Sequence, residues 1–258
     1  MSMSNIEIIF GVSNDYLHIL KPACSLFNEF WSSKKHVKIA GFDAPDFDMP
    51  DNFSFASLGN QRGPKYWTED ILQICDLVEG DYFIFVVEND FLIRPVNFEI
   101  LHVFEKMLQA DKSIARIDLT TSSSVHSMGT IVKSYPSFDI FELPQSADWR
   151  MALGHYSIWN KQYLRSFLKR YPQTTPWEFE ALSCQNAKND GAKILASSRD
   201  YAVHFIDSIH QHQGKNVVDL TGIGGRSSFG LSIDEKIIEK MISENVVRKN
   251  GSFYNVIL

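Results

Sequence analysis

Hydrophobic and polar positions follow two alternating patterns along the first half of the chain. Apolar runs of strand length occupy residues 6–10, 37–42, 53–58, 82–87 and 114–119. Between them, apolar residues recur every three or four positions over residues 15–31, 68–78 and 97–110, as on one face of a helix. This alternation predicts a mostly parallel central sheet flanked by helices, which is a Rossmann-like α/β fold.

The second half carries shorter strand and helix patterns. Strands are predicted at residues 137–142, 151–158 and 192–197, and helices at residues 161–170, 176–190 and 232–244. Ser232 and Glu235 have the spacing of a capping box at the start of the last helix. Polar or glycine-rich segments at residues 43–51, 120–130, 204–216 and 221–230 are predicted to be loops. We expect this half to add a smaller mixed sheet.

Charge and cysteine usage exclude several classes of protein. A net charge of −6 and a pI near 5.7 argue against a nucleic-acid-binding surface and against tight attachment to an anionic membrane. Cys24, Cys75 and Cys184 lack metal or redox spacing, so we expect buried thiols in a reducing compartment. The chain shows no signal peptide and no apolar run of membrane-spanning length. These features predict a cytoplasmic protein without a transmembrane segment.

Acidic residues directly follow the most apolar strand. Glu88, Asn89 and Asp90 come after residues 82–87 and precede another apolar stretch. Carboxylates are not buried unpaired, and ligands of parallel sheets bind beyond the carboxyl ends of the strands. Glu88 and Asp90 would lie on the same side of an extended chain, where they could hold Mg²⁺ or Mn²⁺. The alternative is that both acids cap a turn before the bend at residues 94–95.

A second acidic pair lies at the start of a predicted helix. Thr175 and Glu178 form a capping-box pattern around Pro176, which explains Glu178 structurally. Glu180 points about 200° away from Glu178 on a helix, so we take it as the candidate general base. The alternative for Glu180 is a first-turn acid that is favoured only by the helix dipole.

Several segments in a fixed order carry a family resemblance. They are residues 63–91, which include the acidic triplet, Trp149-Arg150, residues 158–164 and residues 176–180. In these segments the chain resembles bacterial and archaeal glycosyltransferases of the GT-A fold. The resemblance implies a UDP- or GDP-type nucleotide-sugar donor, a Mn²⁺ or Mg²⁺ ion at residues 88–90, and Glu180 or Glu178 near the acceptor. The chain departs from the family pattern in having Glu first and Asn in the middle of the metal motif.

Loops elsewhere supply further candidate ligands. Ser13 and Asp43 follow the first two strands and would contact the nucleotide, although a turn and a helix cap also explain this region. Arg62 and Lys65 would grip a diphosphate, or else form a solvated charged loop. His210 would complete the metal sphere, or else be an ordinary exposed or core histidine.

The acceptor is expected to meet aromatic and basic side chains. These are Trp149, Arg150 and Trp177. The chain is expected to consist of a donor-binding half, residues 1–118, and an acceptor-binding catalytic half, residues 119–258, fused in one compact domain.

The expected activity is transfer of a sugar to a hydroxyl of a carbohydrate or lipid-linked acceptor. It would invert the anomeric centre and serve surface polysaccharide or glycoconjugate synthesis. One alternative is a nucleotidyltransferase, which would want a glycine-rich basic loop after the first strand. Residues 11–15 provide no such loop. The other alternative is a non-catalytic module that binds nucleotides or carbohydrates.

Overall fold

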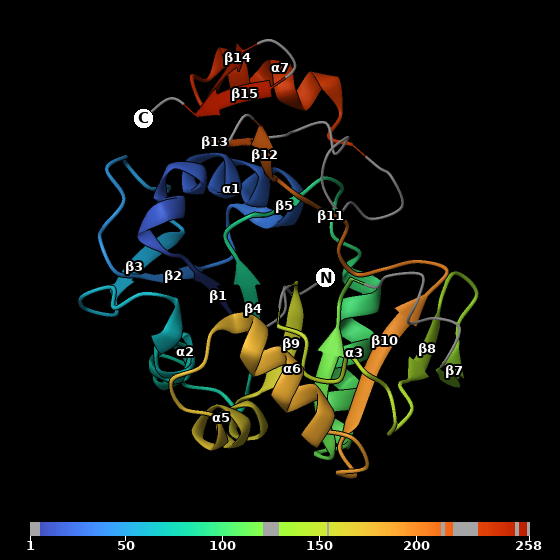
Figure 1. The fold of residues 1–258 in the computed structure, drawn as a ribbon. Coiled ribbons are helices and arrows are strands. Elements are labelled where there is room, and N and C mark those ends of the chain that lie inside the picture. Colours follow the sequence, from blue (N-terminus) through green and yellow to red (C-terminus); the bar gives the residue numbers. More distant parts are fainter. Residues whose placement is uncertain are drawn as a thin grey trace.

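A large mixed sheet forms the centre of the molecule. The computed structural model describes residues 6–120, 129–153, 155–212, 215–218, 232–250 and 253–256. Within this part of the chain, nine strands form the sheet (Figure 1), in the order β3 (Phe53–Ser57), β2 (Val37–Gly41), β1 (Glu7–Gly11), β4 (Tyr82–Val87), β9 (Ser157–Asn160), β6 (Ile114–Asp118), β10 (Lys193–Ser198), β8 (Asp139–Glu142) and β7 (Thr130–Ser134).

Most of these strands run in one direction. β3, β2, β1 and β4 are parallel, and β6 is parallel to β10. β9 lies antiparallel between β4 and β6, and β8 is antiparallel to β10. The carboxyl ends of β1, β2, β4 and β6 therefore meet at one edge of the sheet. The predicted Rossmann-like α/β class is confirmed.

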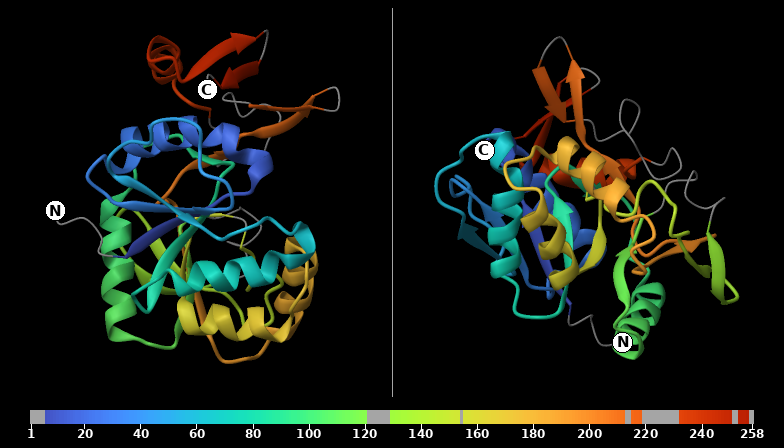
Figure 2. Two further views of the ribbon diagram at one scale, coloured as in Figure 1. Left: turned by 90° about the vertical axis from the view of Figure 1, so that its left-hand side faces the viewer. Right: turned by 60° about the horizontal axis from the view of Figure 1, so that its bottom comes forward.

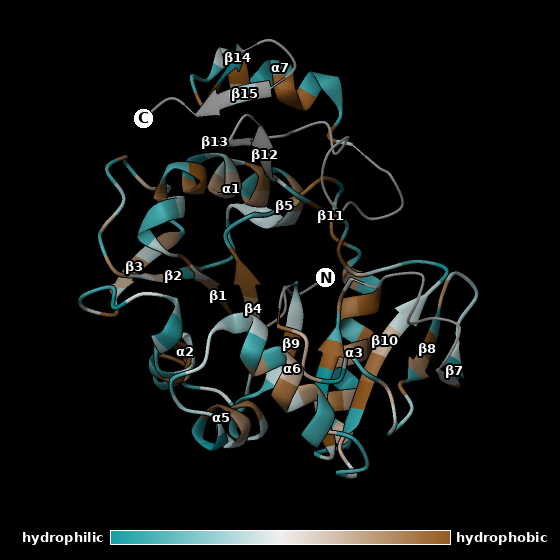
Figure 3. Cartoon of the chain, in the orientation of Figure 1, coloured by the Kyte–Doolittle hydropathy of each residue, from teal (hydrophilic) through white to brown (hydrophobic). Residues whose placement is uncertain are grey.

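Helices cover both faces of the central sheet, because the side chains along each strand point alternately to one face and to the other. Ile8 and Ile84 belong to one core cluster, whereas Ile9 and Phe83 belong to the other. Figure 3 shows the central strands mainly in the hydrophobic colour, as expected for a sheet buried on both faces. Helices α1 (Leu20–Phe27), α3 (Phe98–Ala110) and α7 (Glu235–Ser243) contribute to the first cluster, and α2 (Trp67–Asp76), α5 (Lys161–Arg170) and α6 (Pro176–Asn186) to the second.

Short helical turns extend two of these helices. The predicted helix at residues 15–31 consists of a 3₁₀ turn η1 (Asn14–Ile19), α1 and a π turn η2 (Asn28–Ser32). A 3₁₀ turn η3 (Pro64–Tyr66) leads into α2, and α2 and α5 lie side by side in both views of Figure 2. Cys24, Cys75 and Cys184 are buried free thiols, as predicted.

Two smaller antiparallel sheets contain strands that sequence reasoning missed. β5 (Asp90–Leu92) pairs with β11 (Phe205–Asp207). A four-stranded sheet joins β12 (Ile209–His212), β13 (Lys215–Val218), β15 (Phe253–Val256) and β14 (Val247–Asn250). The prediction of a loop over residues 204–216 was therefore wrong, and the smaller sheet is antiparallel instead of mixed.

Other boundaries also differ from the sequence predictions. The strand expected at residues 151–158 is a turn followed by β9, and β7 was not predicted. The last helix begins after Asp234, whose side chain accepts a hydrogen bond from the Lys236 N–H, so the predicted Ser232 cap was wrong. By contrast, the Thr175–Glu178 capping box at α6 is present. The predicted loop at residues 221–230 and most of that at 120–130 lie outside the described residues.

Candidate active site

The acidic triplet forms a turn where β4 ends. Glu88 and Asn89 occupy the turn, and Asp90 begins β5, where it pairs with Asp207 of β11. The chain is thus not extended across the triplet, so the extended backbone predicted for Glu88 to Asp90 was wrong. The Asn89 side chain donates a hydrogen bond of 2.9 Å to Asp207 Oδ1, which ties the turn to β11.

Asp90 is the most deeply buried acid of this turn. Its side chain is only 1% exposed, and Oδ2 lies 3.0 Å from His155 Nδ1. The Tyr156 hydroxyl donates to the Asp90 carbonyl oxygen at 3.3 Å. Within the described residues, Oδ1 of the same carboxyl is buried without a hydrogen-bond partner. One oxygen of Asp90 is therefore held in place while the other remains available.

Burial and neighbouring acids raise the pKa values of two carboxyl groups in this turn. Burial raises the pKa of Glu88 to about 8, and the charge of Asp90 adds to the effect although the Ser13 N–H opposes it. Burial also raises the pKa of Asp90 to about 6; His155 counteracts this, whereas Asp207 and Asp118 reinforce it. Without a cation, Glu88 therefore keeps its proton most of the time at neutral pH, and a bound cation would favour its ionised form.

His155 supplies a positive partner for the Asp90 carboxyl. Burial lowers the pKa of His155, but the charge of Asp90 and the hydrogen bond to it outweigh burial, so the net shift is upward. The ring also packs against Phe205 of β11, with ring centroids 4.4 Å apart. His155 is thus fixed between the Asp90 carboxyl and the β11 strand.

The residues at this turn suit a divalent cation. The unpartnered Asp90 Oδ1 and the raised pKa values of Glu88 and Asp90 indicate two carboxyl groups that His155 alone does not fully compensate. Among the described residues, no three His, Cys, Asp or Glu side chains converge into a complete metal-binding group. Mg²⁺ is commonly held by one or two carboxylates together with the phosphates of its substrate, so a protein cage of three ligands is not required.

His210 stays a prediction as a metal ligand. It lies on β12 opposite Val217, but its side chain is outside the described part of the structure.

Residues that follow β1, β2 and β3 are linked at the same edge. The Asn14 side chain donates to Asp43 Oδ2 at 2.7 Å and accepts from the Asp43 N–H at 3.0 Å. The Asn14 N–H donates to Gln61 Oε1 at 2.7 Å. The backbone N–H of Ser13 contacts the Glu88 carboxyl, so the predicted donor residues Ser13 and Asp43 lie on loops connected to the acidic turn.

The two predicted diphosphate residues have different surroundings, and Lys65 is the one shown near the start of α6. Arg62 forms an ion pair with Asp70 at 2.9 Å and lies over the Tyr66 ring. Lys65 is exposed and near enough to Glu178 for its charge to help lower the pKa of that carboxyl. The structure therefore brings Lys65 and Glu178 together from segments predicted to bind donor and acceptor.

The two candidate bases have different environments. Glu178 is exposed and accepts a hydrogen bond of 2.9 Å from the Thr175 N–H, and this backbone contact is the main cause of its lowered pKa. A capped carboxylate with a lowered pKa is a weak proton acceptor. Glu180 is partly buried on α6, one turn before Cys184. Between these two acids, Glu180 is the better candidate for a base.

The predicted acceptor residues differ in exposure. The side chains of Trp149 and Trp177 are 54% and 73% exposed, so both rings are accessible to a ligand. Arg150 is fully buried. Its guanidinium donates to the carbonyl oxygens of Pro144, Ala187 and Ala192 and to Asp190 Oδ1. These bonds give Arg150 a structural role, and its burial disfavours the predicted contact with an acceptor.

No family model and no curated protein matches this chain. It is similar in structure to residues 1–349 of TarS from S. aureus, with 14% identity over 78% of this chain and 59% of that chain and a TM-score of 0.49. UDP-glucose pyrophosphorylase with bound UDP-glucose matches at 12% identity over 78% and 92% of the two chains, with a TM-score of 0.44.

A further match is CMP:2-keto-3-deoxy-manno-octonic acid synthetase with bound CTP, at 14% identity over 75% and 89% of the two chains and a TM-score of 0.39. At these identities and TM-scores, the likenesses assign no activity to the chain. Among the helices that the structure describes, none combines the length and the apolar character needed to cross a bilayer.

Sequence reasoning missed three residues around the acidic turn: His155, Asp118 and Asp207. Asp118 is the last residue of β6, and the triplet directly follows β4. The rule that ligands bind beyond the carboxyl ends of parallel strands would therefore have identified Asp118 as well. Its carboxyl accepts from the Thr120 N–H at 2.9 Å and pairs with Arg116 at 3.4 Å. His155 and Asp207 carry no comparable signal, because each reaches Asp90 only through the tertiary fold.

Proposed function

We propose that this protein is a metal-dependent glycosyltransferase that uses a nucleotide-diphosphate sugar. The observation that carries the proposal is the buried Asp90 carboxyl, with one oxygen fixed by His155 and the other without a hydrogen-bond partner among the described residues. It lies where β4 ends, beside loops that follow β1 and β6. In Rossmann-like sheets this edge is the place where nucleotides bind.

The proposed donor site extends from the acidic turn to neighbouring loops. Asp90 and Glu88 would hold Mn²⁺ or Mg²⁺, and Ser13, Asp43 and Asn89 would contact the nucleotide. A divalent cation bound there would stabilise the negative charge that develops on the leaving diphosphate. Arg62 and Lys65 would add positive charge near the same group.

The acceptor would approach from the side of α6. Glu180 would remove the proton of the acceptor hydroxyl as that oxygen forms a bond to the sugar C1 atom. The bond from C1 to the diphosphate oxygen would break, and its electron pair would leave with the nucleoside diphosphate. Attack opposite to the leaving group would invert the anomeric centre. The exposed Trp149 and Trp177 rings would stack on acceptor sugars.

The activity can be tested with a panel of UDP- and GDP-sugars. We expect one donor class to release nucleoside diphosphate in the presence of Mn²⁺ or Mg²⁺, and none to do so in EDTA. Chromatography of the nucleotide products provides the measurement. Nucleotide binding with no release under any condition would indicate a binding module, whereas release of pyrophosphate from a nucleoside triphosphate would indicate a nucleotidyltransferase.

His155 is expected to act as a positioning residue for the Asp90 carboxyl. Replacing His155 with Ala should weaken Mn²⁺ binding about 10- to 100-fold, because outer groups that orient a metal ligand have effects of this size. Calorimetric titration of Mn²⁺ without a donor provides the measurement. His155→Gln should restore part of the affinity, since its amide can donate to Asp90 Oδ2.

The matched control is His102→Ala, which changes a histidine with a 55% exposed side chain on α3. It should leave Mn²⁺ affinity unchanged. Equal affinities in His155→Ala, His102→Ala and the unaltered protein would contradict the positioning role.

A further inference from the structure

A basic pocket lies at the edge of the sheet opposite the acidic turn. β9 runs antiparallel to β4, with Asn160 opposite Tyr82, so α5 begins where β4 starts. The C-terminal end of α2 reaches the same edge. A cavity of about 290 Å³ lies between these two helices and is lined by Cys75, Asp76, Val78, Lys161, Gln162, Arg165 and Lys169.

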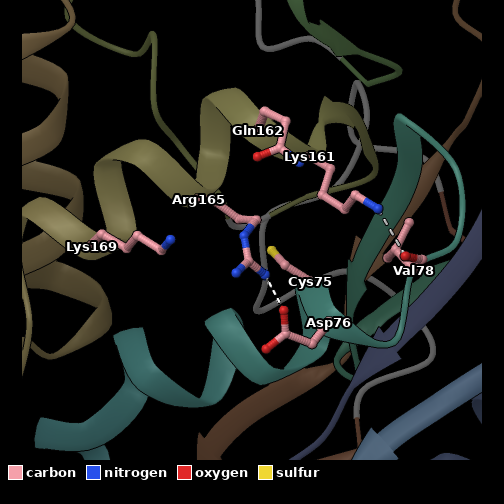
Figure 4. A pocket seen from close by; sticks show the side chains of 7 residues that line it. All are labelled: Cys75, Asp76, Val78, Lys161, Gln162, Arg165 and Lys169. Carbon is pink, nitrogen blue, oxygen red and sulfur yellow. Dashed lines mark hydrogen bonds and ion pairs between the residues drawn. The ribbon is translucent and has the colours of Figure 1, made fainter.

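Three cations of α5 face this cavity. Lys161, Arg165 and Lys169 are spaced four residues apart, which places them along one side of the helix over about 12 Å. Figure 4 shows Arg165 directed toward Asp76 and Lys161 directed toward Val78. Asp76 is the single carboxylate among the lining residues, so the pocket is positively charged in a chain whose net charge is −6.

The cations are partly fixed but retain free donors. Lys161 Nζ donates to the carbonyl oxygens of Val78 at 2.9 Å and Glu79 at 3.4 Å, which leaves one of its three N–H groups. Arg165 pairs with Asp76 through one nitrogen of a guanidinium that carries five N–H groups. In the described part of the chain, Lys169 forms no ion pair. The cluster is therefore preorganised for an anion without being neutralised.

We propose that this pocket binds a phosphate or diphosphate group. Converging Lys and Arg donors are the groups that recognise phosphate oxygens. The cavity volume is at the lower end of the range for ligand pockets, which suits a phosphate group better than a whole nucleotide. The group could belong to a free ion or to the headgroup of an anionic lipid. This site does not depend on the proposed glycosyl transfer, because it shares no residue with the acidic turn.

Two titrations distinguish the two sources of phosphate. In the first, inorganic pyrophosphate is titrated into the full-length protein by calorimetry, with EDTA present so that no divalent cation occupies the acidic turn. In the second, the protein is sedimented with vesicles of phosphatidylglycerol and phosphatidylcholine. The test variant is Arg165→Gln with Lys169→Gln, and the control is Lys34→Gln with Lys106→Gln, which removes the same charge from exposed sites.

The test variant should weaken binding at least about tenfold in one of the titrations, whereas the control should leave it unchanged. Loss of pyrophosphate binding would assign the pocket to a free phosphate, and loss of vesicle binding alone would assign it to a lipid headgroup. Asp76→Asn should tighten binding, because it removes the opposing carboxylate, while Asp51→Asn should not. Equal behaviour of the test and control variants in both titrations would overturn the proposal.

Discussion

Replacing Glu180 with Gln is expected to lower turnover by about 10²- to 10⁴-fold while donor binding is unchanged. The amide keeps the size of the side chain but cannot accept the proton of an attacking hydroxyl. Glu180 is partly buried on α6. Initial rates with a saturating donor and calorimetric titration of the nucleoside diphosphate with Mn²⁺ together measure the two quantities.

Glu178→Gln is the matched control on the same helix. Glu178 closes the capping box with Thr175, so its replacement should lower the free energy of unfolding by about 1 kcal/mol or less and leave turnover near normal. If Glu178→Gln reduced turnover more than Glu180→Gln did, the roles of the two acids would have to be exchanged. A product that retains the anomeric configuration would remove Glu180 from the role of base altogether.

Asp90→Asn is expected to abolish measurable Mn²⁺ binding and to reduce turnover about 10²- to 10³-fold. The substitution keeps the shape of the side chain but removes the buried negative charge that we propose binds the cation. Because that charge is costly to bury without a cation, the metal-free variant should be no less stable than the unaltered protein. Calorimetry with Mn²⁺ and thermal unfolding in EDTA provide the measurements.

Asp51→Asn, at an exposed position, serves as the control and should behave like the unaltered protein in both experiments. Full Mn²⁺ affinity in Asp90→Asn would show that the cation is bound elsewhere. The proposed donor site would then lose its main support.

The first half of the fold could be predicted because its signals are local. The apolar run at residues 82–87 is β4, and the helix predicted at residues 97–110 is α3, capped by Asn97. The C-terminal strands gave no such signal. β11 has three residues, and it is a strand because Phe205 and Ile206 pair with β5, far away in the sequence. Short strands of this kind are defined by their partners more than by their own composition.

The candidate site shows the same limit. Glu88 and Asp90 stand out in the sequence because they interrupt an apolar region. His155 lies 65 residues from Asp90, and only the folded chain reveals that the two side chains touch. Arg150 was predicted to contact the acceptor, but its guanidinium is enclosed by carbonyl oxygens. Nothing in the sequence indicates this enclosure.

The position of β9 has a consequence for synthesis of the chain. Until residues 157–160 leave the ribosome, β4 can pair only with β1. The other edge of this very apolar strand then exposes unpaired backbone N–H and C=O groups. A nascent chain that ends before residue 157 therefore exposes a surface prone to wrong pairing. The order of strands makes completion of the sheet a late event of translation, and a chaperone that shields β4 would act during that interval.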